Sequence, residues 1–275
     1  MNDIQTINSP KNSFEKMPVL FIGHGNPMNA IEINEFSKGW MEIAKTIPKP
    51  KAILCISAHW ETKGTSITAM KMPKTIHDFL GFPKELYNVQ YPADGSPDLA
   101  KETKSLIKNT DVTLDYKWGL DHGCWSVAIN LYPNADVPII QVSLDYSRAP
   151  QYHYELAKEL SSLRNQGVLI IGSGNMVHNL RLAAWDKMDE SGFGFDWAIE
   201  ANEKMKKYIM NGDHTSLINY QTQGTAFNLA IPTPEHYLPL LYVLALKEEN
   251  EKIILFNDKA VAGSLSMTSL KIENN

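Results

Sequence analysis

Short apolar segments alternate with amphipathic segments along nearly the whole chain. Residues 18–23, 52–58 and 168–174 are rich in apolar and β-branched side chains, and they have the length of buried strands. Residues 32–47 and 195–212 carry apolar side chains at every third or fourth position, which predicts helices. This alternation predicts an α/β fold, a three-layer α/β/α sandwich around a central mixed, largely parallel sheet.

The rest of the chain continues the pattern. Further strands are predicted at 65–70, 111–116, 137–145, 252–258 and 264–272, and further helices at 96–109, 124–132, 151–165 and 233–250. Residues 1–16 are polar and lack the apolar stretch of a secretory signal, so we expect a polar N-terminal tail there. Residues 17–275 contain no linker-like stretch or repeat, and we expect them to form a single domain.

Three of the apolar strand segments deliver a histidine where the strand ends. His24 follows the first run, His59 follows the second, and His178 follows the Gly-rich turn after the third. In open α/β sheets ligands bind beyond the carboxyl ends of the strands. We therefore expect these three imidazoles to meet at one site.

Two more histidines stand at predicted helix starts. His236 begins the apolar helix predicted at 233–250, and the adjacent Glu235 could serve only to favour the helix N-terminus electrostatically. His122 lies between a turn and the helix predicted at 124–132. His153 and His214 occur in polar helix contexts, and we expect them to be solvated.

The five dispersed histidines indicate a catalytic metal site. The local spacings of zinc fingers and of HExxH are both absent. Neutral imidazoles bind Zn, Fe, Cu or Ni. Three protein ligands with open positions are typical of a catalytic ion, whereas structural ions are fully coordinated.

The composition of the chain limits which binding partners and which cellular location we expect. The net charge is −5, which gives no basic footprint for nucleic acid. No apolar run reaches the roughly 18 residues that would suggest a membrane span. Two cysteines are too few for a disulfide framework, and a reducing cytoplasm is the expected location. The oligomeric state stays open.

Several motifs together resemble one family. They are "GHGNPM", "SAHW", "DFLGFPKELYNVQYPADGSPDLA", "GLDHGCWSVAINLYPNADVPIIQVSLD", "IGSGNMVHNLR" and "TPEHYLPLLYVLAL". From about Pro18 to Ile272 the chain resembles the DOPA-dioxygenase-type branch of the class III extradiol ring-cleavage dioxygenases. Their best-known relative is the catalytic subunit of protocatechuate 4,5-dioxygenase. The resemblance implies that 17–275 is a single catalytic dioxygenase domain.

The resemblance also implies roles for the histidines. By this likeness His24 and His59 are metal ligands, and the third ligand is His236, with Glu235 as the alternative. His178 matches the acid–base histidine and is a possible additional ligand, while His122 matches a second active-site histidine. The implied cofactor is one divalent metal ion, with Fe(II) expected for turnover and Zn(II) plausible as the bound ion. The implied substrates are a catechol, such as DOPA, and O₂.

Three hypotheses for the function follow. The first is a ring-opening dioxygenase acting on catechols. The second is a zinc-dependent hydrolase, because three imidazoles also make a good site for zinc-bound hydroxide. The third is a non-enzymatic binding protein like the Memo-like proteins. Oxygen uptake with a catechol after loading with iron would discriminate among them.

Overall fold

The computed structural model describes residues 15–188, 190 and 192–275. Most of the predicted tail at 1–16 therefore lies outside the described residues. The central sheet has six strands in the order β6-β2-β8-β1-β12-β9. Their bounds are β1 Val19–Gly23, β2 Ala52–Ser57, β6 Ile139–Gln141, β8 Val168–Gly174, β9 Glu251–Phe256 and β12 Ser269–Asn274.

The pairing of these strands makes the sheet mixed and largely parallel. β6, β2, β8 and β1 are parallel neighbours, whereas β12 runs antiparallel to both β1 and β9. The carboxyl ends of the four parallel strands therefore lie at one edge of the sheet. This is the geometry that the sequence predicted for the strand-end histidines.

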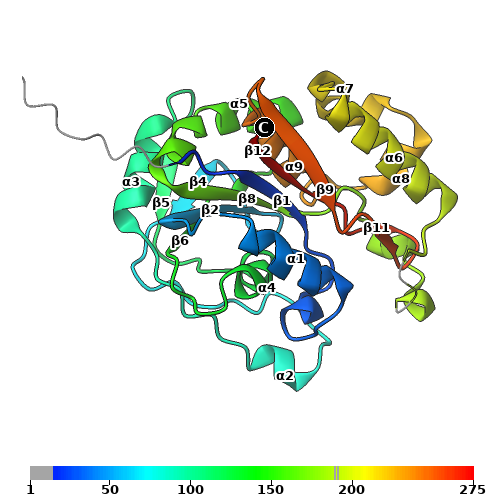
Figure 1. The fold of residues 1–275 in the computed structure, drawn as a ribbon, viewed down its shortest axis with the longest axis horizontal. Coiled ribbons are helices and arrows are strands. Elements are labelled where there is room, and N and C mark those ends of the chain that lie inside the picture. Colours follow the sequence, from blue (N-terminus) through cyan, green and yellow to red (C-terminus); the bar gives the residue numbers. More distant parts are fainter. Residues whose placement is uncertain (1–14, 189, 191) are drawn as a thin grey trace, which may run out of the picture.

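Helices cover both faces of the sheet (Figure 1). On one face, α1 and α4 pack against Leu20 and Ile22 of β1, and on the other, α5 and α9 pack against Val19 and Phe21. The alternation of side chains along β1 thus feeds two apolar layers. The three-layer α/β/α prediction is confirmed. The helices are α1 Glu35–Lys45, α2 Lys84–Tyr87, α3 Pro97–Leu106, α4 His122–Leu131, α5 Pro150–Lys158, α6 Asp196–Met210, α7 His214–Ile218, α8 Thr225–Ala230 and α9 Leu238–Ala245.

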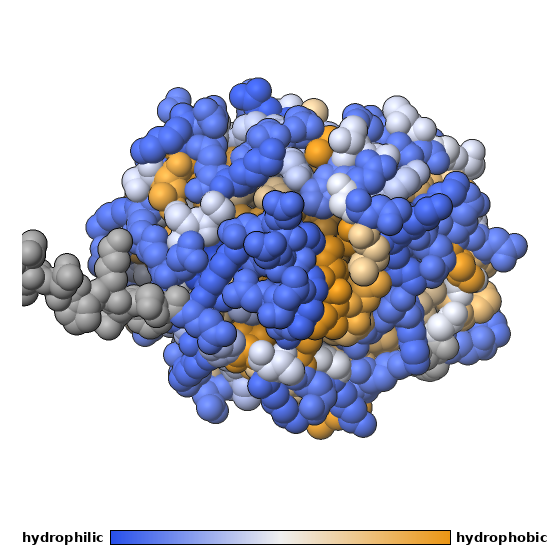
Figure 2. Space-filling model, turned by 45° about the horizontal axis from the view of Figure 1, so that its top comes forward, coloured by the Kyte–Doolittle hydropathy of each residue, from blue (hydrophilic) through white to orange (hydrophobic). Residues whose placement is uncertain are grey.

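Short elements complete the fold. The 3₁₀ helices are η1 Pro27–Ala30, η2 Ser161–Gln166, η3 Leu180–Leu182, η4 Trp185–Lys187 and η5 Tyr220–Thr222. The small strand pairs are β3 Glu61–Thr62 with β7 Leu144–Asp145, β4 Thr65–Thr68 with β5 Val112–Asp115, and β10 Ala260–Val261 with β11 Leu265–Ser266. Hydrophilic side chains cover most of the face shown in Figure 2, where an apolar strip runs between them. Within the described residues, no helix is both long and apolar enough to span a membrane.

Local sequence explains where the first helix begins. Asn34 caps α1 by accepting from the backbone N–H groups of Phe36 and Ser37, and the Ser37 hydroxyl accepts from the Asn34 N–H in return. This capping box fixes the start of the helix. Ile33, which the sequence pattern placed within it, is consequently outside the helix and 74% exposed.

Several expectations about strands and helices need correction. The strand predicted at 137–145 is two short strands, β6 and β7, in different sheets, and the helix predicted at 151–165 ends at Lys158 and is followed by η2. The segment predicted as one strand at 264–272 is broken into β11 and β12, because the hydroxyls of Ser266 and Thr268 turn to Asn202 in α6. His236 was expected within the first turn of a helix. It lies in the turn before α9, where the N–H groups of Tyr237 and Leu238 both donate to the carbonyl of Pro234.

The expectation that His153 and His214 are solvated is wrong for His153. Its side chain is fully buried where α5 packs on α9, and its Nδ1 lies 3.1 Å from the hydroxyl of Tyr242. His214 is half-buried, with Nδ1 2.7 Å from the hydroxyl of Tyr154. The two histidines are held by tyrosines from neighbouring helices, which the local polar context could not reveal. Both cysteines, Cys55 and Cys124, are buried.

Candidate active site

Five histidines from five segments line one cavity of about 220 Å³. His24 follows β1, His59 lies two residues beyond β2, and His178 lies four residues beyond β8. His122 is the first residue of α4, and His236 comes from the turn before α9. His24, His59 and His178, the three strand-end histidines that were expected to meet, all line this cavity. The other lining residues are Gly25, Asn26, Pro27, Phe79, Phe82, Leu180, Trp185, Met188 and Leu265.

Glycines allow two of these segments to approach the strand ends. A Cβ on Gly174 would lie 2.1 Å from the carbonyl oxygen of His236, so only glycine lets this turn pack against β8. A Cβ on Gly123 would lie 2.4 Å from the Ser57 hydroxyl and 2.8 Å from the ring of His59. The glycine-rich end of β8 therefore serves close packing that positions His236.

The rings of His24, His59 and His236 lie at similar distances from one another. The ring centroids of His24 and His59 are 5.0 Å apart, those of His24 and His236 are 5.3 Å apart, and those of His59 and His236 are 5.0 Å apart. Metal–nitrogen bonds of about 2.1 Å at a tetrahedral ion place imidazole centroids about 5 Å apart. The Nε2 atoms of His24 and His59 are separated by 3.1 Å. These three rings therefore have a spacing that suits a shared ion.

The two remaining histidines sit against these rings. The centroid of His122 lies 3.8 Å from that of His59 and 5.8 Å from that of His24. His178 stacks on His236 at 3.5 Å with an interplanar angle of only 8°. Among the described residues, two groups have ligand atoms within 4.8 Å of one another, namely His24 with His59 and His122, and His178 with Glu235 and His236.

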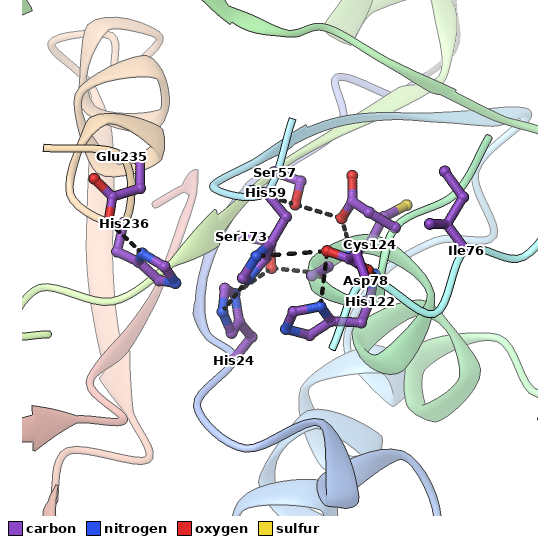
Figure 3. Close-up of polar contacts among 12 residues, drawn as sticks. His24, Ser57, His59, Ile76, Asp78, His122, Cys124, Ser173, Glu235 and His236 are labelled. Atoms are coloured by element: carbon purple, nitrogen blue, oxygen red, sulfur yellow. Dashed lines mark hydrogen bonds and ion pairs between the residues drawn. The ribbon is translucent and has the colours of Figure 1, made fainter. Parts of the chain in front are cut away.

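Four of the five histidines have a polar side chain next to Nδ1, on the side of the ring away from the cavity. For His24 this is the Ser173 hydroxyl at 3.0 Å. For His236 it is Oε1 of Glu235 at 3.2 Å. Asp78 faces both His59 and His122 (Figure 3). Such partners fix the tautomer and leave Nε2 with its lone pair directed away from them.

Burial keeps the imidazoles neutral. It lowers the pKa of His24 and of His59 well below the usual value, and the neighbouring imidazoles lower both further. Burial, followed by the charge of a protonated His236, lowers the pKa of His178 to about 3. Neutral imidazole is the form that ligates a metal. The donor set, its spacing and its protonation state all fit a divalent ion.

Glu235 is held as a carboxylate beside His236. Burial alone would raise its pKa, but the contact with His236 and the hydrogen bond from Thr233 outweigh burial and lower it. Its Oε1 therefore faces the back of the His236 ring.

Sequence reasoning missed the outer partners of the histidines. Asp78 is the first residue of the block "DFLGFPKELYNVQYPADGSPDLA" and Ser173 lies within "IGSGNMVHNLR", but neither residue was given a role in the site. The apolar wall formed by Phe79, Phe82 and Trp185 was also not predicted. Phe79 and Phe82 enter the site from a loop and Trp185 from η4, and the local pattern does not specify the course of either segment.

Comparison with known proteins decides the family. The family model described as the catalytic LigB subunit of aromatic ring-opening dioxygenase matches residues 18–261. The chain belongs to this family. Its members use a metal, which agrees with the histidine site of this LigB-family chain. The resemblance noted in the sequence is confirmed.

Individual relatives cover nearly the whole chain. The 4,5-DOPA dioxygenase extradiol of Escherichia coli K12 is 46% identical over 266 residues, which is 94% of this chain and 96% of that protein. The protein of the same name from Beta vulgaris is 37% identical and covers 91% of this chain, with 94% of its own length matched. A crystal structure of an uncharacterized Escherichia coli K12 protein matches with a TM-score of 0.81 at 41% identity. That match covers 94% of this chain and all of that one.

These matches resolve the three functional hypotheses. The chain is an aromatic ring-opening dioxygenase of the extradiol family. The zinc-hydrolase alternative rested on the histidines and the binding-protein alternative on the likeness to Memo-like proteins, and the family match with its dioxygenase relatives favours the first hypothesis over both. Small-molecule substrate and O₂ follow from that membership.

Proposed function

We propose that this dioxygenase opens a catechol ring, such as that of DOPA, with one Fe(II) ion held by His24, His59 and His236. The observation that carries the proposal is the mutual spacing of these three rings, 5.0–5.3 Å between centroids around one cavity. The relatives named 4,5-DOPA dioxygenase extradiol support DOPA as a substrate. When bound, the iron supplies a redox centre through which electrons pass between catechol and O₂.

His236 is the better third ligand than Glu235. The contact between Glu235 and Nδ1 of His236 assigns the carboxylate to the back of that ring, where it orients the imidazole and increases its basicity. The Nε2 atom of His236 then stays available for the ion.

His178 serves as the acid–base group. It lies in the cavity with its ring stacked flat on His236. Two parallel stacked rings cannot both direct their in-plane lone pairs at one ion, which argues against His178 as an additional ligand. A neutral His178 can accept a proton from a catechol hydroxyl and return it as the ring opens.

His122 hydrogen-bonds the substrate or dioxygen on the opposite side. Its ring lies against His59, and its backbone is fixed at the start of α4, where Asp121 caps the helix by accepting from the N–H of Cys124. Phe79 and Phe82 supply the apolar wall for an aromatic ring and limit the access of water.

The metal and the catechol are tested together. The protein is stripped of metal, reloaded with Fe²⁺ or Zn²⁺ without air, and mixed with L-DOPA or another catechol. Iron-loaded protein is expected to consume O₂ and form a yellow ring-opened semialdehyde. Zinc binds imidazoles more tightly than iron does and is expected in the same site after purification in air, but it has no redox chemistry. Equal turnover by iron-free, zinc-loaded protein would contradict the proposal.

The third ligand is tested by two substitutions. We expect His236→Ala to lose bound metal, measured by metal analysis after dialysis, and Glu235→Ala to weaken binding less. Full metal content in His236→Ala with loss in Glu235→Ala would make Glu235 the ligand.

Two further features belong to the proposal. Residues 17–275 act as a single catalytic domain, which the span of the family match and the sheet built from β1 to β12 both support. A cytoplasmic location stays a prediction, supported by two buried cysteines that form no disulfide.

A further inference from the structure

One carboxylate stands behind two of the five histidines in the cavity. Oδ2 of Asp78 lies 3.0 Å from Nδ1 of His122 and 3.6 Å from Nδ1 of His59 (Figure 3). Oδ1 of the same residue accepts from the backbone N–H of His122 at 2.9 Å. Glu235, by comparison, has its 3.2 Å contact with Nδ1 of His236.

The loop that carries Asp78 is fixed to the elements bearing these rings. The N–H of Ile76 donates to the carbonyl of Leu120 at 2.7 Å, and the carbonyl of Ile76 accepts from Nε1 of Trp125 in α4 at 2.8 Å. The side chain of Asp78 is only 18% exposed. Its position is therefore set by the packing of the loop on α4, with little freedom to move.

The position of Asp78 determines what both rings present to the cavity. A lone pair on Nδ1 of His122 would be repelled by the carboxylate oxygen 3.0 Å away, so we assign the proton of His122 to Nδ1. The longer 3.6 Å contact favours the same tautomer for His59. Both Nε2 atoms then present lone pairs. His59 uses this Nε2 lone pair to bind the metal, and His122 uses its own to accept a hydrogen bond from the substrate.

We propose that Asp78 is a positioning residue that orients His59 for metal binding and His122 for catalysis at the same time. This inference rests on the proposed function of the two histidines. Asp78 touches neither metal nor substrate and acts only through the two rings. Its loss should therefore change two separate quantities, the affinity for the metal and the turnover of fully loaded enzyme.

The experiment replaces the carboxylate and measures both quantities. For Asp78→Asn, zinc affinity, measured by chelator competition, is expected to fall about 10–100-fold, the usual effect of removing an outer partner of a ligand. At saturating Fe²⁺, kcat for the catechol is expected to fall at least about tenfold with KM within about threefold, because His122 acts in the transition state. Asp78→Glu, which restores the carboxylate, is expected to lie between wild type and Asp78→Asn in both.

Asp145→Asn is the matched control. Asp145 is a buried turn aspartate that accepts from the N–H and hydroxyl of Ser147, away from the cavity. Its substitution is expected to lower the unfolding midpoint while leaving zinc affinity and kcat unchanged.

Several outcomes would overturn the inference. They are an Asp78→Asn protein with wild-type zinc affinity and kcat, a protein changed only in its unfolding midpoint, and equal losses in Asp78→Asn and Asp78→Glu. If Asp78→Asn does not fold, Asp78→Glu decides, since wild-type values of both quantities would then overturn it and lower values would support it. Wild-type protein that turns over no catechol would refute the proposed function instead, and the zinc measurement would still test Asp78.

Discussion

Two buried polar clusters lie at opposite edges of the same sheet. The histidine cavity occupies the edge where β1, β2 and β8 end, and an ion cluster around Arg164 and Glu251 occupies the edge where β1 and β8 begin. Both sets of polar side chains are removed from water, and the side chains of Arg164 and Glu251 are each 1% exposed. They differ in how the polar groups are compensated.

At the ion cluster the protein supplies every partner. Arg164 donates from Nε to the carbonyl of Met17 at 2.8 Å and from Nη1 to the carbonyl of Leu246 at 2.7 Å, and it forms a two-point ion pair with Glu251. Lys16 adds a second cation 3.0 Å from Glu251. The cluster joins the start of β1, the end of α9 and the start of β9.

In the cavity the partners are like groups. Burial and the neighbouring imidazoles lower the pKa values of His24, His59 and His178, and the Nε2 atoms of His24 and His59 face each other at 3.1 Å. A cation compensates such an arrangement, whereas protonation does not. The two regions differ in what balances their buried polar groups. Oppositely charged side chains and carbonyl groups do so at the ion cluster, whereas the histidine cavity relies on a bound ion.

The largest expected effect is on catalysis, from His178→Ala. We expect kcat to fall about 10²–10⁴-fold, the usual contribution of an acid–base group, with metal content retained. The unfolding midpoint of metal-free protein is expected to fall slightly, because the neutral ring that stacks on His236 is removed. Steady-state oxygen uptake, metal analysis and thermal unfolding measure the three quantities.

His214→Ala is the control for this substitution, since that ring lies outside the cavity and bonds to Tyr154. It should leave kcat unaltered. A His178→Ala enzyme with near-normal turnover would remove His178 from the mechanism.

The next largest expected effect is at the ion cluster, where we expect a substitution to lower stability and to leave catalysis unchanged. Arg164→Met leaves the buried Glu251 with Lys16 as its remaining cation. We expect the free energy of unfolding to fall by about 3–5 kcal/mol, while kcat per folded molecule stays unchanged at 25 °C. Urea unfolding monitored by circular dichroism gives the stability.

Arg148→Met provides the comparison for an exposed pair, because Arg148 is 56% exposed where it meets Asp145. Its cost should stay below about 1 kcal/mol. Equal costs for the two arginines would mean that burial of the Arg164 pair has no special weight.

The smallest expected effect is the loss of stability at low pH that follows from protonation of Glu251. Burial alone would raise the pKa of Glu251, but hydrogen bonds from Arg164, the backbone of Glu248 and Lys16 outweigh it and lower that pKa. Because the folded-state pKa lies below the unfolded value of about 4.3, the stabilisation is complete above that pH and is lost as pH falls through the folded-state pKa.

The stability difference between wild type and Glu251→Gln should therefore narrow between pH 6 and pH 3, by an amount on the order of 1 kcal/mol. Urea titrations of both proteins across this range measure it. A difference that stays constant with pH would show that Glu251 does not titrate as the paired carboxylate.

Local pattern was sufficient for most of the framework. The apolar runs that became β1, β2 and β8 were recognised because burial on both faces demands continuous apolar sequence. The break between β11 and β12 and the burial of His153 were not, because each depends on side chains from distant segments. The Asn34 cap is local, but the apolar Ile33 extended the helical pattern past it and the predicted helix began too early.

The sequence by itself determined the chemistry of this protein. Strands that end in His24 and His59 place imidazoles at one sheet edge through chain connectivity alone, and the ordered motifs mark the family. Only the tertiary structure decided how the rings face one another and which neighbour stands behind each. Asp78 reaches two histidines only because the loop at 76–78 packs on α4. Ring orientation depends on such packing between segments far apart in the chain, which local periodicity does not encode.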